Sequence, residues 1–377
     1  MLIQLKQKVG RHLLNFPGWR TNRKIVVIES DDWGSIRMPS KTAFKALLKA
    51  GIRVDKCPYN RYDTLASESD LSHLFEVLTS VKDSNGRYPV ITANAIMTNP
   101  DFEKIRGSDF RIYFHELFTK TLQKYPGCNH SWNLWQEGMK SGVFHPQLHG
   151  REHLNVGRWM RALQSKSPET QLAFQHSLFG ISTTITQEKR RSYQAALDYD
   201  TSGDKAFIVK SVKEGAALFQ NFFGHRSTSF IAPNYCWDND IEKALQAANI
   251  HVLQSGRVQK TPIGAGRKVI RHYMGQKNTW GQVYLVRNCI FEPSITGSRQ
   301  AVENCLADIR TAFFWCKPAI ISSHRLNYIG TLDSKNSYTN LRLLTKLLKT
   351  IKQQWPEVEF WNSAQLGQQI RKQLLER

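Results

Sequence analysis

Short apolar runs separated by longer amphipathic stretches dominate this chain. Eight runs bounded by turn residues predict strands at 24–30, 89–96, 142–148, 229–234, 251–256, 283–291, 319–324 and 358–363. Apolar positions at helical spacing fill most of the intervals and predict helices that include 101–125, 241–248, 299–315 and 339–355. Strand and helix therefore alternate, which indicates a parallel α/β architecture.

Polar and ionisable residues gather where several of these strands end. They are Asp31 and Asp32, His145 and His149, Asn234, Glu292 and His324. An α/β barrel places its site at the carboxyl ends of its strands, whereas an open dinucleotide-binding sheet usually carries a G-x-G-x-x-G turn, which is missing after the first strand. We therefore predict a distorted (β/α) barrel of seven to eight strands.

The barrel is expected to be one domain over residues 21–377, preceded by a basic amphipathic segment at 1–20. The polar stretch 164–204 interrupts the alternation of strand and helix, which predicts an insertion after the third barrel strand. Segment 1–20 is able either to lie on a membrane surface or to cap the core of the fold, and the sequence leaves both open.

Charge and cysteine content indicate partners and compartment. The net charge of +21 and the pI near 9.8 favour an anionic substrate, an acidic lipid surface or nucleic acid. No secretory signal, C-x-x-C pair or long apolar run is present. We expect a cytoplasmic protein, with peripheral contact to an anionic membrane as an option, and we make no prediction of its oligomeric state.

The stretch VVIESDDWGS ends an apolar run in three carboxylates within four residues. Like charges this close resist burial, so a cation is the simplest way to compensate the charge of these carboxylates. The stretch FHPQLHGREH carries histidines at 145, 149 and 153, and only two of them need be ligands. Because residues four apart share one side of a strand or a helix, we predict that His145 and His149 bind one metal ion. The metalloprotease pattern H-E-x-x-H is missing.

These two motifs resemble those of the polysaccharide deacetylases, the metal-dependent carbohydrate esterases whose first motif is T-F-D-D-G and whose second is H-[ST]-x-x-H. The resemblance implies that Asp31 is the catalytic base and that Asp32 joins His145 and His149 on one divalent ion. Zinc is expected, because two imidazoles, a carboxylate and water form a common catalytic zinc shell. Such an ion lowers the pKa of a bound water.

Two further stretches match the family in part. Residues 230–235, FIAPNY, resemble its R-x-P-[YF] motif, which implies that the backbone N–H of Asn234 faces the oxyanion. Ile231 replaces the family arginine, so another residue must orient the base, with Arg37, Arg151 and Arg325 as candidates. His324 in ISSH resembles the histidine that acts as general acid.

The substrate-binding predictions rest on side chains that would lie beside the metal. Trp33, Tyr235 and Trp237 are expected to stack on a sugar ring, or else to pack at the barrel rim. Arg151 and Glu292 complete the predicted substrate contacts, and Glu292 stands where the family carries a D-x-x-D-W segment.

The resemblance predicts a hydrolase that removes an N-acetyl or O-acetyl group from a sugar in a bacterial surface-polysaccharide or glycolipid pathway. The carbohydrate would be anionic or phospholipid-linked, as the basic surface suggests, and nucleic acid is not expected. A metal-dependent phosphoesterase or nuclease is the first alternative, although many such enzymes use two metals. A sugar-binding relative without catalysis is the second, which the missing arginine allows.

Overall fold

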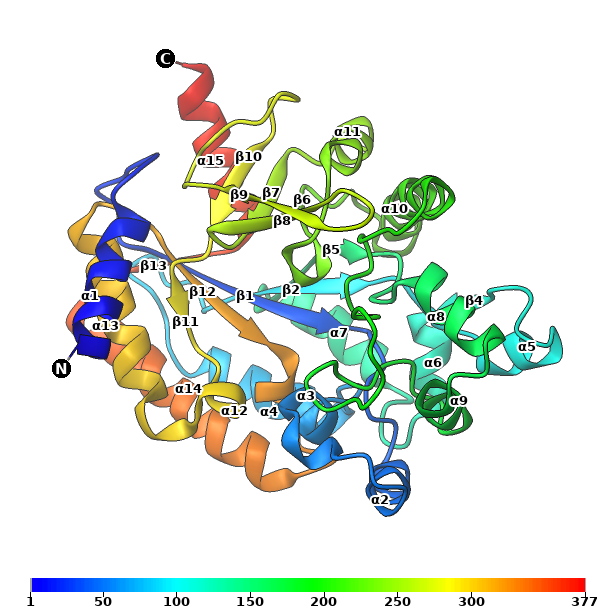
Figure 1. Ribbon diagram of the computed structural model, residues 1–377. Coiled ribbons are helices and arrows are strands. Elements are labelled where there is room, and N and C mark those ends of the chain that lie inside the picture. The colour runs from blue at the N-terminus through cyan, green and yellow to red at the C-terminus, as the bar shows by residue number, and fades with distance from the viewer. Residues whose placement is uncertain (1, 377) are drawn as a thin grey trace.

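A computed structural model describes residues 2–376, with side chains from residue 8 onward. Nine strands form one parallel sheet in the order β10-β7-β6-β5-β2-β1-β12-β11, with β13 pairing the start of β1 (Figure 1). Their bounds are β1 Ile25–Trp33, β2 Ile91–Ile96, β5 Phe144–Gly150, β6 Ser229–Ile231, β7 Val252–Ser255, β10 Val283–Val286, β11 Cys289–Ile290, β12 Ala319–His324 and β13 Glu359–Trp361. All eight predicted apolar runs are confirmed as strands of this sheet.

The sheet curls into a barrel that backbone pairing does not close. Within the described residues no ladder joins β10 to β11, so the chain itself crosses the gap at Arg287 and Asn288. The Asn288 side chain accepts from Ile320 N at 2.8 Å and donates to Pro318 O at 2.9 Å. These two bonds fix the crossing to the backbone at the start of β12, the strand that β11 pairs with. The predicted distorted (β/α) barrel is confirmed.

Helices surround the sheet (Figure 1). They are α1 Leu2–Asn15, α2 Lys41–Lys49, α3 Pro58–Tyr62, α4 Glu68–Thr79, α5 Phe102–Gly107, α6 Phe118–Lys124, α7 Ser131–Lys140, α8 Val156–Gln164, α9 Pro168–Gln175, α10 Ser202–Phe223, α11 Asn239–Ala247, α12 Pro293–Thr296, α13 Ala301–Phe314, α14 Ser334–Gln354 and α15 Ser363–Leu375. Their sequences carry start and stop signals: Thr201 and Asp204 form a capping box on α10, and Gly224 ends that helix at a φ of 71°.

One helical prediction was wrong. The segment 101–125 is not one helix, because Asp109 and Phe110 turn the chain at φ of 48° and 59°. Between α5 and α6 the chain instead forms β4 His115–Leu117, which pairs antiparallel with β3 Thr98–Pro100. The apolar spacing there serves packing on both sides of a turn, which periodicity alone does not distinguish from a continuous helix.

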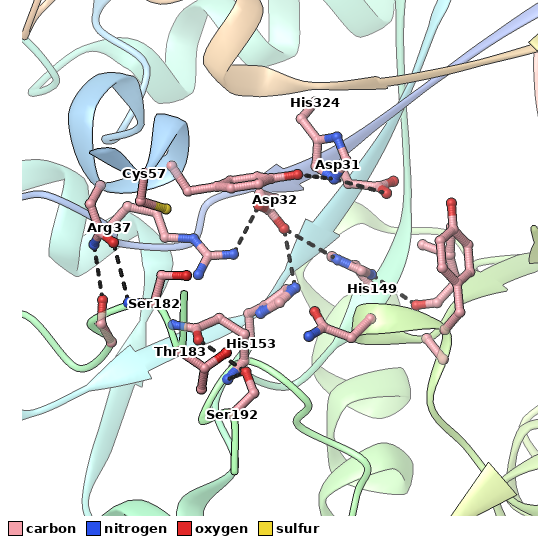
Figure 2. Close-up of a pocket in the computed structure, with 18 residues that line it drawn as sticks. Asp31, Asp32, Arg37, Cys57, His149, His153, Ser182, Thr183, Ser192 and His324 are labelled. Atoms are coloured by element: carbon pink, nitrogen blue, oxygen red, sulfur yellow. Dashed lines mark hydrogen bonds and ion pairs between the residues drawn. The ribbon is translucent and has the colours of Figure 1, made fainter. Parts of the chain in front are cut away.

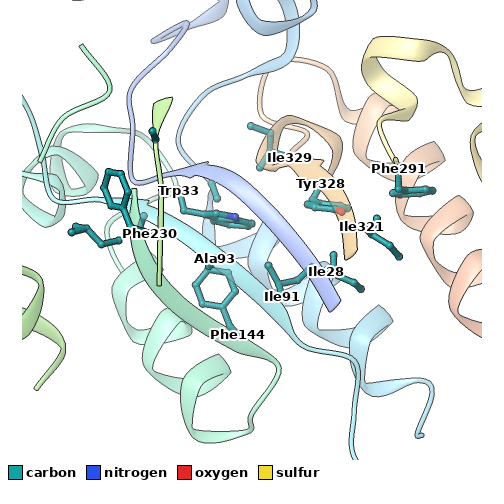
Figure 3. Packing of buried hydrophobic residues seen from close by; sticks show 14 of the residues in the cluster. Ile28, Trp33, Ile91, Ala93, Phe144, Phe230, Phe291, Ile321, Tyr328 and Ile329 are labelled. Atoms are coloured by element: carbon teal, nitrogen blue, oxygen red, sulfur yellow. The ribbon is translucent and has the colours of Figure 1, made fainter. Parts of the chain in front are cut away.

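The barrel interior changes character along its axis. On β1 the inward positions are Val27, then Glu29, then Asp31, so an apolar floor gives way to a buried polar layer. Val27 packs in a cluster with residues of α15, including Leu366 and Ile370, which close the bottom. Outward-facing residues of the same strands, such as Ile28, Ile91 and Phe144, form the larger core under the helices (Figure 3). The polar layer therefore lies at the carboxyl ends of the strands, where a site belongs.

The segment 164–204 follows the third barrel strand, as predicted, and runs over the carboxyl ends of the strands. It contains α9 and an irregular stretch held by ion pairs to Asp198, whose side chain is fully buried. Arg158 on α8 and Arg267 on the hairpin strand β9 Arg267–Arg271 reach Asp198 at 2.8 and 2.6 Å. This inserted segment is thus fixed to the body of the molecule.

Helix α1 lies on α13. Arg11 pairs with Asp308 at 2.5 Å, and Trp315 donates to His12 at 3.0 Å. Val9 and Leu13 are exposed, and the side chains of residues 1–7 in the predicted segment 1–20 lie outside those described. None of the described helices combines the length and the apolar character that crossing a membrane requires.

Candidate metal centre and active site

Strand β1 turns two consecutive carboxylates toward one pocket. Successive side chains of a regular strand point to opposite faces, but the register of β1 against β2 shifts between Ser30 and Trp33, and Asp32 has a φ of 74°. Aspartate tolerates this left-handed conformation better than most residues. Asp31 and Asp32 therefore both line the pocket (Figure 2).

A buried cluster suited to a metal ion forms around Asp32. Its Oδ1 lies 3.5 Å from Nε2 of His149 and 3.2 Å from Nε2 of His153, and the three ligand atoms lie within 4.8 Å of one another. His149 approaches from the end of β5, and His153 from the loop after it (Figure 2).

The hydrogen-bonding state of both imidazoles suits ligation. Nδ1 of His149 lies 2.8 Å from the carbonyl oxygen of Ile231 and donates to it. This leaves the lone pair of Nε2 to face the cluster. That Nε2 is buried with no hydrogen-bond partner. Burial lowers the pKa of His153 to about 3, so its ring is neutral, as a metal ligand must be.

Arg37 holds the second oxygen of Asp32. Its Nη2 lies 3.0 Å from Oδ2, and its other partner is Asp63. Burial acts to raise the pKa of Asp32, but Arg37 and then His153 outweigh it, and the pKa falls well below its usual range. The carboxylate is therefore ionised and keeps Oδ1 for the cluster.

The structure corrects the prediction that His145 is a ligand. His145 lies near the start of β5, four residues and about 13 Å of strand before His149. Its Nε2 is 3.0 Å from Gln147, and its ring stacks near His225. His153 takes the predicted place, and HGREH at 149–153 has the same spacing as HPQLH at 145–149. Spacing alone does not reveal which pair stands at the end of the strand.

Arg287 is the partner of Asp31, and the sequence analysis missed it. Two guanidinium nitrogens reach the Asp31 oxygens at 2.6 and 2.8 Å, while Nε donates to Glu29 at 2.6 Å. Burial acts to raise the pKa of Asp31, but Arg287 outweighs it and lowers that pKa. Asn94 adds a donor at 2.7 Å to Asp31.

None of the three arginines named as candidates contacts Asp31. Arg37 serves Asp32, Arg325 pairs with Asp63, and Arg151 pairs with Glu152 and Glu214. One signal did point to Arg287. It interrupts the apolar run 283–291, and a charge inside a buried run requires a partner.

His324 and Glu292 form a second charged pair across the pocket from the cluster. Nδ1 of His324 lies 2.5 Å from Oε1 of Glu292, and Nε2 lies 3.8 Å from Asp31 and 3.3 Å from the hydroxyl of Tyr59. Burial acts to lower the pKa of His324, but Glu292 outweighs it and raises the pKa to about 9. The ring is therefore protonated at neutral pH. Glu292, predicted to bind substrate, instead contacts His324.

The segment after β6 forms the opposite wall. Asn234 and Tyr235 both line the pocket, each with a positive φ. Asn234 is exposed there, so its predicted oxyanion role is compatible with its place. The Tyr235 hydroxyl accepts from Arg287 at 3.2 Å, and Tyr235 is one of the residues that line the pocket.

Three predicted substrate contacts are wrong because their side chains point into the core or away from the pocket. Trp33 is fully buried against Phe144 and donates to Ser30 (Figure 3). Trp237 is buried and donates to Glu242. Arg151 is buried in its ion pairs with Glu152 and Glu214. The alternative reading of the tryptophans as packing residues holds.

The pocket itself measures about 340 Å³. Strand ends supply its charged floor, α3 supplies Tyr59 and Asn60, and the inserted segment supplies Gly180, Ser182, Thr183, Ser192 and Gln194. Asn60 donates to Gly180 O at 3.1 Å and accepts from Ser182 N at 3.2 Å, so it joins α3 to the inserted segment. The cations in the lining are Arg37 and protonated His324, and each is already paired with a carboxylate.

Comparison with known proteins identifies the fold. No family model and no curated protein matches the sequence. Among solved structures, a provisionally assigned glycoside hydrolase/deacetylase from Parabacteroides distasonis aligns over 94% of this chain and 73% of its own, with a TM-score of 0.50 at 10% identity. This chain has the polysaccharide deacetylase fold.

Two further structures of provisionally assigned polysaccharide deacetylases align over most of both chains. The one from Pseudomonas aeruginosa PAO1 has a TM-score of 0.46 at 8% identity and covers 93% of this chain and 91% of its own. The one from Mycobacterium smegmatis has a TM-score of 0.45 at 10% identity and covers 95% and 93%. The alignment with the Parabacteroides distasonis structure confirms the resemblance seen in the motifs at the level of the fold.

Proposed function

We propose that this protein is a metal-dependent hydrolase that removes an acetyl group from the nitrogen or oxygen of a sugar. One observation carries the proposal: a cluster of Asp32, His149 and His153 lines the same pocket as an ionised carboxylate, Asp31, and a protonated imidazole, His324. Hydrolysis of an amide or ester needs a proton acceptor on one side of the acyl carbon and a proton donor on the other.

The donor set fits one divalent cation, for which zinc is the leading candidate. It offers two imidazole nitrogens and one carboxylate oxygen, and it leaves further positions free, as catalytic zinc sites do. The buried Nε2 of His149, without a hydrogen-bond partner, is the observation that favours a metal over a hydrogen-bonded cluster. Bound there, the ion would supply Lewis acidity toward an acyl oxygen and toward water.

The chain's own groups divide the proton transfers. Asp31 takes the proton of the attacking water, while Arg287 keeps the carboxylate ionised and aimed. His324 then gives the proton at Nε2 to the departing amine or alcohol, and Glu292 holds the ring through Nδ1. The Tyr59 hydroxyl, 3.3 Å from that Nε2, marks where the leaving group accepts the proton. A backbone N–H at Asn234 would stabilise the charge on the acyl oxygen.

The pocket favours a neutral sugar as the reacting unit. Its lining carries hydroxyl and amide side chains, and its cations, Arg37 and His324, are already paired with carboxylates. Any anionic part of the substrate, such as a phosphate in a lipid-linked or surface-polysaccharide intermediate, would then remain outside the pocket. The basic surface suits that part.

The two alternatives receive less support. A two-metal phosphoesterase or nuclease needs a second ligand cluster, and the described residues hold one. A sugar-binding relative without catalysis was allowed by Ile231 in place of the family arginine, but Arg287 supplies a guanidinium to the same carboxylate.

Metal content and acetate release, measured on the same preparation, test the proposal. Purified protein should hold one zinc per chain and release acetate from N-acetylated or O-acetylated sugars. Asp31→Asn should retain the metal and lose at least about 100-fold in turnover, since general-base catalysis contributes about 10²–10⁴. A full complement of metal without acetate release from any sugar would favour the binding protein, and cleavage of phosphodiesters would favour the nuclease.

A further inference from the structure

A two-stranded hairpin forms a sheet of its own, separate from the barrel sheet (Figure 1). It consists of β8 Val258–Pro262 and β9, paired antiparallel with Lys260 opposite Val269 and Val258 opposite Arg271. Because side chains alternate along a strand, the hairpin has two faces. Gln259 on one face is buried and donates to Trp237 O. Lys260, Val269 and Arg271 on the other face are exposed.

The charged residues in and around the hairpin are all basic. From residue 251 to 291 the sequence contains seven lysines and arginines and no aspartate or glutamate. Arg287 belongs to the active site, and Arg267 pairs with Asp198. Four exposed cations of the hairpin make no ion pair with any described residue: Arg257, Lys260, Lys268 and Arg271. Such a set attracts a polyanionic surface.

Apolar side chains are interspersed with these cations. Ile263 at the hairpin tip is 62% exposed, Val269 is 51% exposed and Tyr273 just beyond β9 is 41% exposed. Aliphatic side chains among lysines and arginines suit the boundary between lipid headgroups and acyl chains. A nucleic acid or a charged glycan would gain little from an isoleucine at the tip, so the chemistry favours a bilayer.

The hairpin also lies next to the pocket. Lys260 bridges to Cys236, and Gly256, just before β8, lies beside the Tyr235 ring that lines the pocket. The Tyr199 hydroxyl of the inserted segment donates to Pro262 O at 3.0 Å. A surface bound by the hairpin would therefore lie beside the pocket wall.

We propose that the outer face of the β8–β9 hairpin docks on the anionic headgroup surface of a lipid bilayer. The contact goes beyond the hydrolytic function and does not depend on it. Its chemistry is two unpaired cations on that face, Lys260 and Arg271, with Val269 on the same face and Ile263 at the hairpin tip entering the headgroup layer. Docking would place the pocket beside a lipid-borne substrate.

Sedimentation of the full chain with vesicles tests the docking. Wild-type protein should bind vesicles of phosphatidylcholine with about 30% phosphatidylserine, which present a strongly anionic surface. It should bind pure phosphatidylcholine vesicles far less, and it should dissociate from the anionic vesicles as salt is raised. Each cation near such a surface contributes about a fivefold gain in partitioning. The double variant Lys260→Gln/Arg271→Gln should therefore partition about 25-fold less. Ile263→Asn should weaken binding at high salt more than at low salt.

A matched control uses two exposed cations of α14, Arg342→Gln/Lys349→Gln, which lie far from the hairpin in Figure 1. This variant should bind vesicles almost as wild type does. Equal losses in both double variants, or equal binding to neutral vesicles, would overturn the proposal. So would tighter binding of a short DNA duplex than of anionic vesicles at the same salt. Acetate release from a soluble sugar should be unchanged in the hairpin variant, so failure of docking and failure of hydrolysis are separate results.

Discussion

Three buried carboxyl groups on one strand are stable here because each is paired with a buried arginine. Glu29 and Asp31 share Arg287, while Asp32 has Arg37 on one oxygen and two imidazoles facing the other. Removing a partner from such a group leaves a buried charge uncompensated, which is far costlier than losing a surface ion pair. A substitution in the site is therefore best compared with the same substitution of a like residue that lies nearby but outside the site.

His153 and His145 provide such a matched pair for the metal. His153→Ala should reduce zinc content well below one per chain, because it removes one of three ligands at the cluster. His145→Ala should leave zinc content unchanged, because its ring contacts Gln147 about 13 Å of strand away. Elemental analysis of both variants decides the assignment. Loss of zinc in His145→Ala would restore the ligand set predicted from the sequence.

Glu292 should set the alkaline limb of the pH–rate profile. It raises the pKa of His324 to about 9, so the general acid keeps its proton through neutral pH. In Glu292→Gln the pKa of His324 should fall, and the alkaline limb should move down by about 1–2 pH units. The acid limb should stay in place, because Arg287 rather than Glu292 governs the pKa of Asp31. Profiles of kcat/KM measured for both proteins check this.

The same pair makes a prediction for stability. A histidine whose pKa is raised by folding stabilises the native state fully below its ordinary value of 6.5 and loses that contribution as the pH rises through about 9. Wild-type protein should therefore lose thermal stability between pH 6.5 and 9 more steeply than Glu292→Gln. Parallel melting curves for the two proteins over that range would contradict the pairing.

At the scale of elements, the open seam between β10 and β11 is the feature that local sequence does not encode. Asn288, in the crossing from β10 to β11, makes two side-chain hydrogen bonds to the backbone at the start of β12, and its burial leaves no water to replace them. Asn288→Ala should lower the free energy of unfolding by about 1–3 kcal/mol, the cost of buried unpaired backbone groups. The exposed Asn22→Ala is the control, with a change within about 0.5 kcal/mol. Denaturant unfolding measures both.

The strands were predictable because a parallel strand covered on both faces must be an apolar run, as 24–30 and 319–324 are. The convergence of Asp31, Asp32, His149 and His324 followed from the rule that parallel strands present their carboxyl ends at one edge. Where a strand ends was not predictable, and that position decides between His145 and His153. The segment 101–125 was predicted as one helix because apolar residues that pack on both sides of a turn have the same spacing as those of a helix.

Contacts made across the barrel were beyond the sequence analysis for a different reason. Arg287 meets Asp31 across 256 positions, and Tyr59 meets His324 across 265. No local periodicity records such a pairing. The burial of Trp33 and Trp237 could not be predicted either. The sequence around an aromatic residue beside a site is the same whether its side chain faces the pocket or the core.

At the scale of the whole molecule, charge and shape are divided between two regions. The outer surface carries most of the net charge of +21, whereas the pocket has no free cation and is lined by neutral groups around its catalytic floor. The inserted segment makes this division possible, because it covers the carboxyl ends of the strands and is fixed there through Asp198. If the proposed function holds, anionic partners would be attracted to the exterior, and the reacting sugar would enter a cavity without a free cation.

The shape of that cavity predicts which substrates react. Its volume of about 340 Å³ lies at the low end for small-molecule sites, and Asn60 closes one side by joining α3 to Gly180 and Ser182. A polymer cannot pass through a closed side, so acetylated mono- and disaccharides or chain ends should react faster than internal units of a long chain.

Asn60→Ala should open this wall, because it removes both hydrogen bonds that hold the inserted segment to α3. The ratio of kcat/KM for a long acetylated oligosaccharide to that for a disaccharide should then rise about tenfold, the effect of about 1.4 kcal/mol of relieved exclusion. Zinc content should be unchanged, since Asn60 contacts no residue of the cluster. Acetate release measured over a series of chain lengths provides the ratio. A wild-type protein that deacetylates long chains as fast as short ones would show that the wall between α3 and the inserted segment is no barrier.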